Sequence, residues 1–300
     1  MTDQAQKLRL MASNISDRVR GKINGEQKLT RVIAITSGKG GVGKTNFTVN
    51  FALAIKELGL NVVILDADMG LANVDLLLGV NAKFNLLHVM AGSKRLEEII
   101  VTCEDGIMII PGGSGVRELA DLGSEQIMEF MEQVEYLEGK SDVLLIDTGA
   151  GISSSVIHFL LAADEIILLT TPEPTAIADA YGVVKTINSI MGKNKKCIKL
   201  VVNKADNKAE GELTSKKICR AADSFLEYKI ELLGTIGYDK YVSMAVKEQM
   251  PFMKRYPKAK ATSEITAMAE RYFYPEKNIK KQSSGIKSFF NKVTSFINAN

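Results

Sequence analysis

Short apolar runs recur along the chain and alternate with segments whose apolar residues return every three or four positions. The runs lack polar alternation and several contain β-branched residues, as strands buried on both faces do. They occupy residues 32–35, 62–65, 107–110, 143–146, 166–169, 198–202 and 233–236. Strands that alternate with helices predict an α/β fold, here a doubly wound, mostly parallel sheet with helices on both faces.

Two amphipathic segments fall outside this alternation. Residues 2–20 place small and large apolar residues on one helical stripe, and glycines at 21 and 25 then form a linker. After a polar hinge, the C-terminal segment places its large apolar residues on one helical face: Ile286, Phe289, Phe290, Val293, Phe296 and Ile297. We therefore divide the chain into an N-terminal segment (1–28), a folded domain (29–274) and a hinge with a terminal helix (275–300).

The C-terminal helix has two interpretations. Lysines flank its apolar face, and three phenylalanines at a chain end are typical of a helix that lies in a membrane interface. One such helix binds weakly, whereas two in a dimer bind much more tightly through effective concentration. The alternative is a helix that docks on the domain. We expect membrane binding, and both states can occur in turn.

Composition limits the remaining classes of function. The net charge of +3 does not indicate a nucleic-acid binder, and 46% hydrophobic content suits a globular domain. Three scattered cysteines without metal-ligand spacing indicate a reducing compartment rather than a disulfide framework. We expect no signal peptide and no membrane-spanning helix, and therefore a cytoplasmic protein.

A glycine-rich loop follows the first apolar run and precedes a helical segment. Its spacing, G-x4-G-K-T, is that of a phosphate loop, in which backbone N–H groups and a helix N-terminus bind phosphate. Lys44 is expected to reach the β- and γ-phosphates, and the Thr45 hydroxyl to ligate Mg²⁺. The expected nucleotide-binding residues here are Gly38, Lys39, Gly40, Gly41, Val42, Gly43, Lys44, Thr45 and Asn46.

The loop contains a second lysine that the ordinary motif does not need. Lys39 follows the first glycine directly, and it is available to reach a nucleotide on a facing subunit. The alternative is a solvated loop lysine without a role in chemistry.

Aspartates follow two other apolar runs at the edge where phosphates would lie. Asp66 and Asp68 leave the second run, and one can order Mg²⁺ while the other positions the attacking water. Asp147 ends the fourth run and is expected to reach Mg²⁺ through water, with glycines that permit a switch loop. Asp66 can also simply cap the chain turn.

Two further loops leave alternatives open. The segment 171–175, T-P-E-P-T, is either a rigid turn or an interface and nucleotide-sensing loop. The sequence Asn203-Lys204-Ala205-Asp206 resembles the guanine-reading motif of GTPases, although Asn203 also suits the amino group of adenine. The lysine-bearing loop favours ATP over GTP.

The string G-K-G-G-V-G-K-T resembles the deviant Walker A loop of the MinD/ParA (SIMIBI) family of dimerising P-loop NTPases. Residues 3–9, D-Q-A-Q-K-L-R, resemble the D-Q-A-x-x-L-R segment of the FlhG family, MinD-like regulators of flagellar number and placement also called FleN or YlxH. Residues 171–181 also look like this branch. The resemblance covers essentially the whole chain.

The resemblance implies roles that the residues alone do not give. It implies an ATP-dependent homodimer in which Lys39 acts across the interface, with Asp68 as the water-orienting switch residue and slow ATP hydrolysis. It also implies action with flagellar basal-body or C-ring components at the inner face of the cell membrane. The segment expected to stimulate the partner GTPase FlhF contains Asp3, Gln4, Ala5, Leu8 and Arg9.

One rival function belongs to another class. A partitioning ATPase of the ParA type binds DNA as a dimer through surface lysines. The near-neutral charge and the aromatic C-terminal segment count against it, and we expect no specific nucleic acid.

Overall fold

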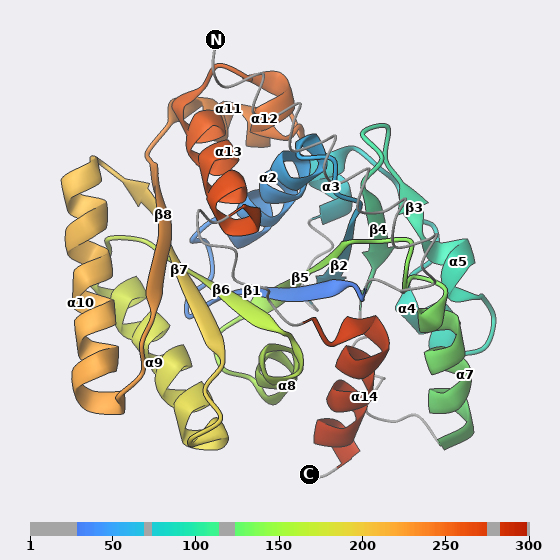
Figure 1. Ribbon diagram of the computed structural model, residues 1–300. Helices are drawn as coiled ribbons and strands as arrows, with labels where there is room; N and C mark the ends of the chain where they lie inside the picture. Colours follow the sequence, from blue (N-terminus) through green and yellow to red (C-terminus); the bar gives the residue numbers. More distant parts are fainter. Residues whose placement is uncertain (1–28, 69–73, 114–123, 275–282, 299–300) are drawn as a thin grey trace.

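Parallel strands joined by helices build the domain, as the sequence predicts. The computed structural model describes residues 29–68, 74–113, 124–274 and 283–298. Within these residues, eight strands form one sheet in the order β3-β4-β2-β5-β1-β6-β7-β8. Neighbouring strands are parallel except at the β3–β4 edge. The prediction of a doubly wound, mostly parallel sheet is confirmed (Figure 1).

The strands coincide with the apolar runs, apart from one short addition. The two-residue strand β3 was not predicted, because two residues cannot show a strand period. The strands are β1 (Arg31–Ser37), β2 (Val62–Ala67), β3 (Val101–Thr102), β4 (Met108–Pro111), β5 (Val143–Ala150), β6 (Glu165–Thr170), β7 (Cys197–Ala205) and β8 (Glu231–Gly237).

Helices cover both faces of this sheet. On one face lie α2 (Lys44–Glu57), α3 (Val74–Leu78), α11 (Lys240–Lys247), α12 (Phe252–Arg255) and α13 (Lys260–Phe273). On the other lie α4 (Leu86–Met90), α5 (Leu96–Ile99), α7 (Ser124–Glu135), α8 (Ser154–Ala162), α9 (Pro174–Met191), α10 (Lys208–Leu226) and α14 (Gly285–Asn298).

Alternate residues of each central strand enter two separate cores. In β1, Ile33 and Ile35 pack with α2 and α13, whereas Val32 and Ala34 pack on the face of α8 and α14. All four side chains are fully buried. Because strand side chains alternate between faces, a run without polar residues is required to fill both cores.

The C-terminal helix is docked rather than free. Phe289 and Phe290 are 0% and 1% exposed, in a groove between α7 and α8. Phe290 meets the ring of Phe130 edge-on at 5.0 Å between centroids, and Phe289 lies 5.7 Å from Phe159. The apolar face expected to meet a membrane is therefore covered by the protein itself in this conformation, because the groove offers an equally apolar surface. The side chain of Ile297 lies outside the described residues.

Two carboxylates fix the start of this helix to the sheet. Glu138 accepts hydrogen bonds from the backbone N–H of Ile286 and of Thr30, each at 2.7 Å. Asp164 accepts from the N–H and hydroxyl of Ser284 and from the N–H of Val32. Negative charge at a helix N-terminus is favourable, so both contacts stabilise the docked position.

No helix among the described residues is long and apolar enough to cross a bilayer.

Truncation of a docked phenylalanine should destabilise the protein. We expect Phe289→Ala to lower the free energy of unfolding by about 3 kcal/mol, because a buried ring is lost and a cavity remains. The control is Phe225→Ala, whose side chain is 79% exposed. Urea denaturation followed by circular dichroism measures both, and equal midpoints for the two variants would contradict the docked arrangement.

Candidate nucleotide-binding site

The glycine-rich loop lies between β1 and α2, the arrangement that a phosphate loop requires. Gly41 and Gly43 have φ of 78° and 94°, values that side chains with a Cβ rarely adopt. Gly43 is the N-cap residue of α2, and Lys44 is its first helical residue. The first N–H groups of a helix have no intrahelical acceptor, so they are available to an anion above the loop.

Neighbouring elements hold this loop closely on two sides. A Cβ on Gly38 would lie 2.2 Å from the carbonyl carbon of Asp179 in α9, so only glycine fits there. On the other side, the Asn203 amide donates to the carbonyl of Val42 at 2.8 Å, and the Lys204 ammonium donates to that of Gly41 at 2.8 Å. The loop is therefore set by α9 and by the end of β7, and not by its own sequence alone.

Asn203 holds the phosphate loop in this conformation. Its Oδ1 accepts the backbone N–H of Lys204, while its Nδ2 donates to the loop. Lys204, which sequence reasoning did not single out, also holds the loop. A contact between Asn203 and the base stays a prediction.

Three carboxylates converge on one lysine at the ends of β2 and β5. Lys44 Nζ lies 3.1 Å from Asp147 Oδ1 and 3.6 Å from Asp68 Oδ2. The register of the parallel strands places Asp66 directly beside Asp147. Thr48 of α2 donates its hydroxyl to Asp147 Oδ1 at 3.0 Å. The structure therefore brings together the residues predicted to act on phosphate and metal.

Negative charge is in excess at this point. Burial, and then the charge of Asp147, raise the pKa of Asp66 from 3.8 to about 7. Asp147 Oδ2 is fully buried and has no hydrogen-bond partner among the described residues. A buried carboxylate oxygen without a partner is costly unless a cation or donor completes it.

This donor set fits Mg²⁺. The ion prefers oxygen ligands and retains several waters, and it is usually held by one or two carboxylates together with phosphate oxygens. Asp147 and Asp66 would supply the carboxylates, and Thr45 lies in the first turn of α2, directly after Lys44. No cluster of three or more His, Cys, Asp or Glu ligands occurs in the described parts of the chain, as expected for an ion that needs the nucleotide to complete its shell.

Lys39 is paired within its own chain. Its ammonium donates to Glu173 Oε2 at 2.9 Å and to Thr175 Oγ1 at 3.0 Å. Both partners belong to the T-P-E-P-T segment, and the lysine hydrogen bond lowers the pKa of Glu173. The Lys39 and Glu173 side chains remain 41% and 61% exposed. This segment therefore contacts the phosphate loop directly, while an action of Lys39 across a dimer stays a prediction.

A cavity of about 330 Å³ opens beside the phosphate loop. Its wall is mostly apolar, and its polar lining includes Asn46, Asn203 and Asp239. Asp206 is exposed and does not line it, so the interpretation of residues 203–206 as a guanine reader loses its key carboxylate. Sequence reasoning missed the apolar lining, which comes from Phe47, Val242, Val246 and Phe252.

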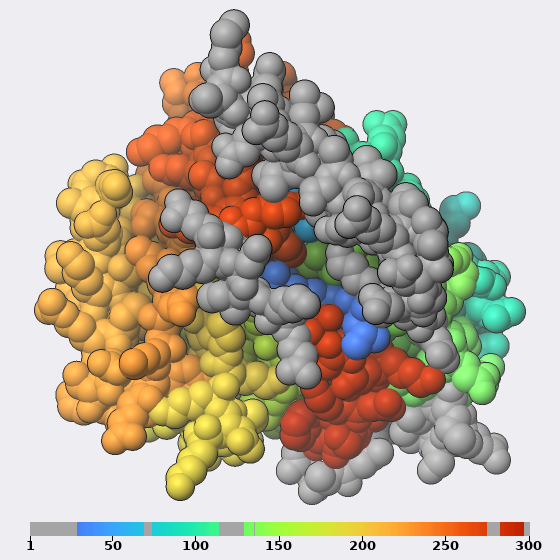
Figure 2. Space-filling model, in the orientation of Figure 1, coloured from blue at the N-terminus to red at the C-terminus, as the bar shows by residue number. Residues whose placement is uncertain are grey.

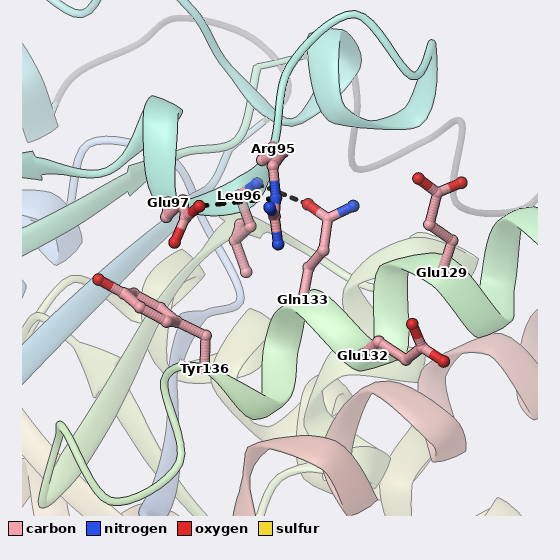
Figure 3. A pocket seen from close by; sticks show the side chains of 7 residues that line it. All are labelled: Arg95, Leu96, Glu97, Glu129, Glu132, Gln133 and Tyr136. Carbon is pink, nitrogen blue, oxygen red and sulfur yellow. Dashed lines mark hydrogen bonds and ion pairs between the residues drawn. The ribbon is translucent and has the colours of Figure 1, made fainter.

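A second cavity, of about 350 Å³, lies between α5 and α7 (Figure 3). Glu97, Glu129 and Glu132 line it together with Arg95, whose guanidinium is 3.5 Å from Glu97. Three carboxylates against one arginine disfavour a phosphate anion. The phosphate loop therefore remains the candidate nucleotide site.

The predicted partner-binding residues Asp3, Gln4, Ala5, Leu8 and Arg9 lie outside the described residues.

Comparisons with known proteins agree on one family. The ParA family profile, described as NUBPL iron-transfer P-loop NTPase, matches residues 28–273. The chain is 38% identical to the antiactivator FleN of Pseudomonas aeruginosa, over 82% of this chain and 88% of FleN. It is 35% identical to the flagellum site-determining protein YlxH of Helicobacter pylori, over 89% of this chain and 91% of YlxH.

A solved structure with bound Mg-ADP has a similar fold. The septum site-determining protein MinD of Pyrococcus horikoshii, complexed with Mg-ADP, superposes with a TM-score of 0.64 and 27% identity. The match covers 81% of this chain and 96% of that protein.

The carboxylate cluster should make the stability of the folded chain depend on pH. Because the pKa of Asp66 is raised from 3.8 to about 7, the folded chain binds a proton more tightly than the unfolded chain between these values. The stability contributed by this group is therefore present at low pH and is lost as the pH rises from about 4 to about 7.

Asp66→Asn should remove this dependence. The quantity of interest is the free energy of unfolding of the variant minus that of the unsubstituted protein, without nucleotide or Mg²⁺. Between low pH and pH 8, we expect this difference to shift in favour of the variant by up to about 4 kcal/mol. Urea denaturation across the pH range measures it, with exposed Asp223→Asn as the control. Parallel pH profiles for Asp66→Asn and the unsubstituted protein would contradict the assigned charge crowding.

Proposed function

The chain belongs to the MinD/ParA family of P-loop NTPases, and from that premise we propose a MinD-like ATPase that dimerises with ATP and regulates flagellar number and placement. The observation that carries the proposal is the phosphate loop with its additional Lys39, set against the Lys44–Asp147 pair. The names of FleN and YlxH support the flagellar role.

Adenine is the base that we propose for the cavity beside the loop. An apolar wall suits a stacked purine ring, and Asp206, the carboxylate of the N-K-x-D motif, does not line the cavity. The Mg-ADP in the MinD structure supports the same choice.

Hydrolysis is proposed to proceed by positioning and charge stabilisation. Lys44 would exchange Asp147 for the β- and γ-phosphate oxygens, and Asp147 would then be available to help hold Mg²⁺. Asp68, 29% exposed beside Lys44, orients the attacking water in line with the γ-phosphate. When bound, Mg²⁺ supplies neutralisation of the phosphate oxygens. We propose slow turnover, as suits a timing switch.

Dimerisation is proposed to transfer Lys39 from its own chain to the nucleotide of a facing subunit. The pair with Glu173 is solvent-exposed, and such pairs contribute only about 0–1 kcal/mol. A γ-phosphate in a closed interface is therefore a competitive partner for the lysine.

We propose that the two ends of the chain bind partners. Residues 1–28 would stimulate the GTPase FlhF, and basal-body or C-ring components would be further flagellar partners. Release of α14 from its groove would present its apolar face to the inner surface of the cell membrane. The docked helix would then be the resting state of a cytoplasmic protein.

Lys39→Gln should abolish ATP-dependent dimerisation while the monomer stays folded. Glutamine keeps hydrogen bonds to Thr175 possible but removes the charge that would meet the γ-phosphate. Light scattering with ATP and Mg²⁺ measures the dimer fraction, and Lys208→Gln, whose side chain is 89% exposed, is the control. An unchanged dimer fraction in Lys39→Gln would sink the role across the interface.

Phe130→Ala should increase membrane binding before any nucleotide is added. The substitution weakens the groove at the Phe130–Phe290 contact but leaves the sequence of α14 intact, so the released state gains population. We expect at least about a fivefold increase in sedimentation with liposomes, since 1 kcal/mol of weaker docking shifts the equilibrium by that factor.

Deletion of residues 286–300 supplies the complementary test. The truncated protein should lose ATP-dependent sedimentation, and exposed Phe225→Ala should behave as the unsubstituted protein. If truncated protein with ATP still pellets with liposomes, α14 is not the membrane anchor.

A further inference from the structure

We propose that lysines at the amino ends of β7 and β8, together with those of docked α14, form a surface that binds anionic phospholipid headgroups before α14 leaves its groove. This lysine edge is defined by Lys193, Lys195, Lys196, Lys229, Lys287 and Lys292. The proposal rests on the proposed membrane function and adds a first, electrostatic step that needs no nucleotide.

Topology places these residues on one edge. Parallel strands β1, β6, β7 and β8 begin at the same side of the sheet. Lys195 and Lys196 precede β7, and Lys229 precedes β8. The Lys195 ammonium donates to the carbonyl of Glu227 in the neighbouring connection. The phosphate loop follows the other end of β1, so the lysine edge lies opposite the nucleotide.

The docked helix joins the same edge. Ser284, directly before α14, is bonded to Asp164 at the start of β6, and Lys292 of α14 lies 3.5 Å from the Ser284 hydroxyl. Lys196 donates to the carbonyl of Ala163 at 2.6 Å, beside Asp164. Figure 2 shows α14 in red and the end of α9 in yellow on one visible face of the molecule.

Five of these lysines have no carboxylate partner among the described residues. None of the described residues places a carboxylate within ion-pair distance of Lys193, Lys195, Lys196, Lys229 or Lys292. Asp164 and Glu138 hold α14, and Glu165 pairs with Arg31, while Glu227 meets Lys195 through its backbone carbonyl. Burial and the charge of Lys292 lower the pKa of Lys196 to about 8, against an opposing effect of Asp164. An anion here would relieve repulsion between the two lysines.

The polar side of α14 offers a place for such anions. An open hollow of about 560 Å³ is lined by Lys287 and Lys292 with Ser284, Ser288, Asn291 and Ser295. None of the described residues that line it carries a carboxylate. Ammonium and hydroxyl donors around an open hollow suit phosphate oxygens, and a bilayer presents many such phosphates in one plane.

The neighbouring α14 decides between a bilayer and other polyanions. Its covered face contains Phe289, Phe290 and Val293, which suit an acyl boundary and have no use on a nucleic acid. A surface that first holds headgroups would keep the groove within reach of the lipid into which the helix inserts. Each lysine near an anionic surface contributes about 1 kcal/mol, or roughly fivefold in partitioning.

The test uses the full chain without nucleotide and vesicles that contain about 30 mol% phosphatidylglycerol in phosphatidylcholine. We expect weak sedimentation that falls by at least tenfold between about 50 and 200 mM salt, and none with phosphatidylcholine alone. The variant Lys193→Gln/Lys195→Gln/Lys229→Gln should lose about tenfold or more of this binding. All three substitutions lie outside α14 and outside the nucleotide site.

A matched variant controls for total charge. Lys83→Gln/Lys208→Gln/Lys258→Gln removes three exposed lysines elsewhere on the chain and should bind as the unsubstituted protein does. Equal losses in both variants, or no loss in the first, would overturn the lysine edge. The lysine edge would also be overturned if Lys193→Gln/Lys195→Gln/Lys229→Gln keeps vesicle binding but loses the retardation of a DNA duplex. ATP-dependent binding through α14 is measured separately, so the proposed function can survive failure of this step.

Discussion

The crowding of three carboxylates around Lys44 is the constraint on which the nucleotide site depends. Parallel pairing of β2 with β5 places Asp66 beside Asp147, and Asp68 approaches the same ammonium. One lysine cannot neutralise three acids, and burial together with the charge of Asp147 raises the pKa of Asp66 to about 7. The arrangement therefore suits an added cation: Asp66 and Asp147 would hold Mg²⁺, which would supply positive charge to the crowded carboxylates.

At the same carboxyl-terminal edge of the sheet, the phosphate loop is in close contact with its neighbours. Gly38 has no room for a Cβ against α9, and Gly43 has none against Asn203. These approaches place Lys39 next to Glu173 and Thr175 at the start of α9. The phosphate loop is therefore in direct contact with both the T-P-E-P-T segment and the end of β7.

The strands and the phosphate loop follow from the sequence because their signals are local. Apolar runs mark strands buried on both faces, and the glycine spacing marks the loop. The cavity beside the phosphate loop could not be predicted, since Phe47 and Val242 lie far apart in the chain and meet only through packing. The bracing role of Asn203 depends on a contact 161 residues away. The docking of α14 was one of two alternatives that the sequence left open, because an apolar groove and a bilayer demand the same helical face.

Helix α8 lies next to the carboxylate site at one end and packs against α14 further along. It begins just after the loop that follows Asp147, where a methyl group on Gly149 would lie 3.4 Å from Val156 and 3.8 Å from Asp68. Further along, its Phe159 packs against Phe289 of α14. A shift of α14 from almost fully docked to almost fully released needs about 5.5 kcal/mol of differential binding. No single exposed contact such as Lys39–Glu173 supplies that amount. The proposed release of α14 would therefore need more than one such contact, and the proposed dimer and headgroup contacts are candidates to supply the remainder.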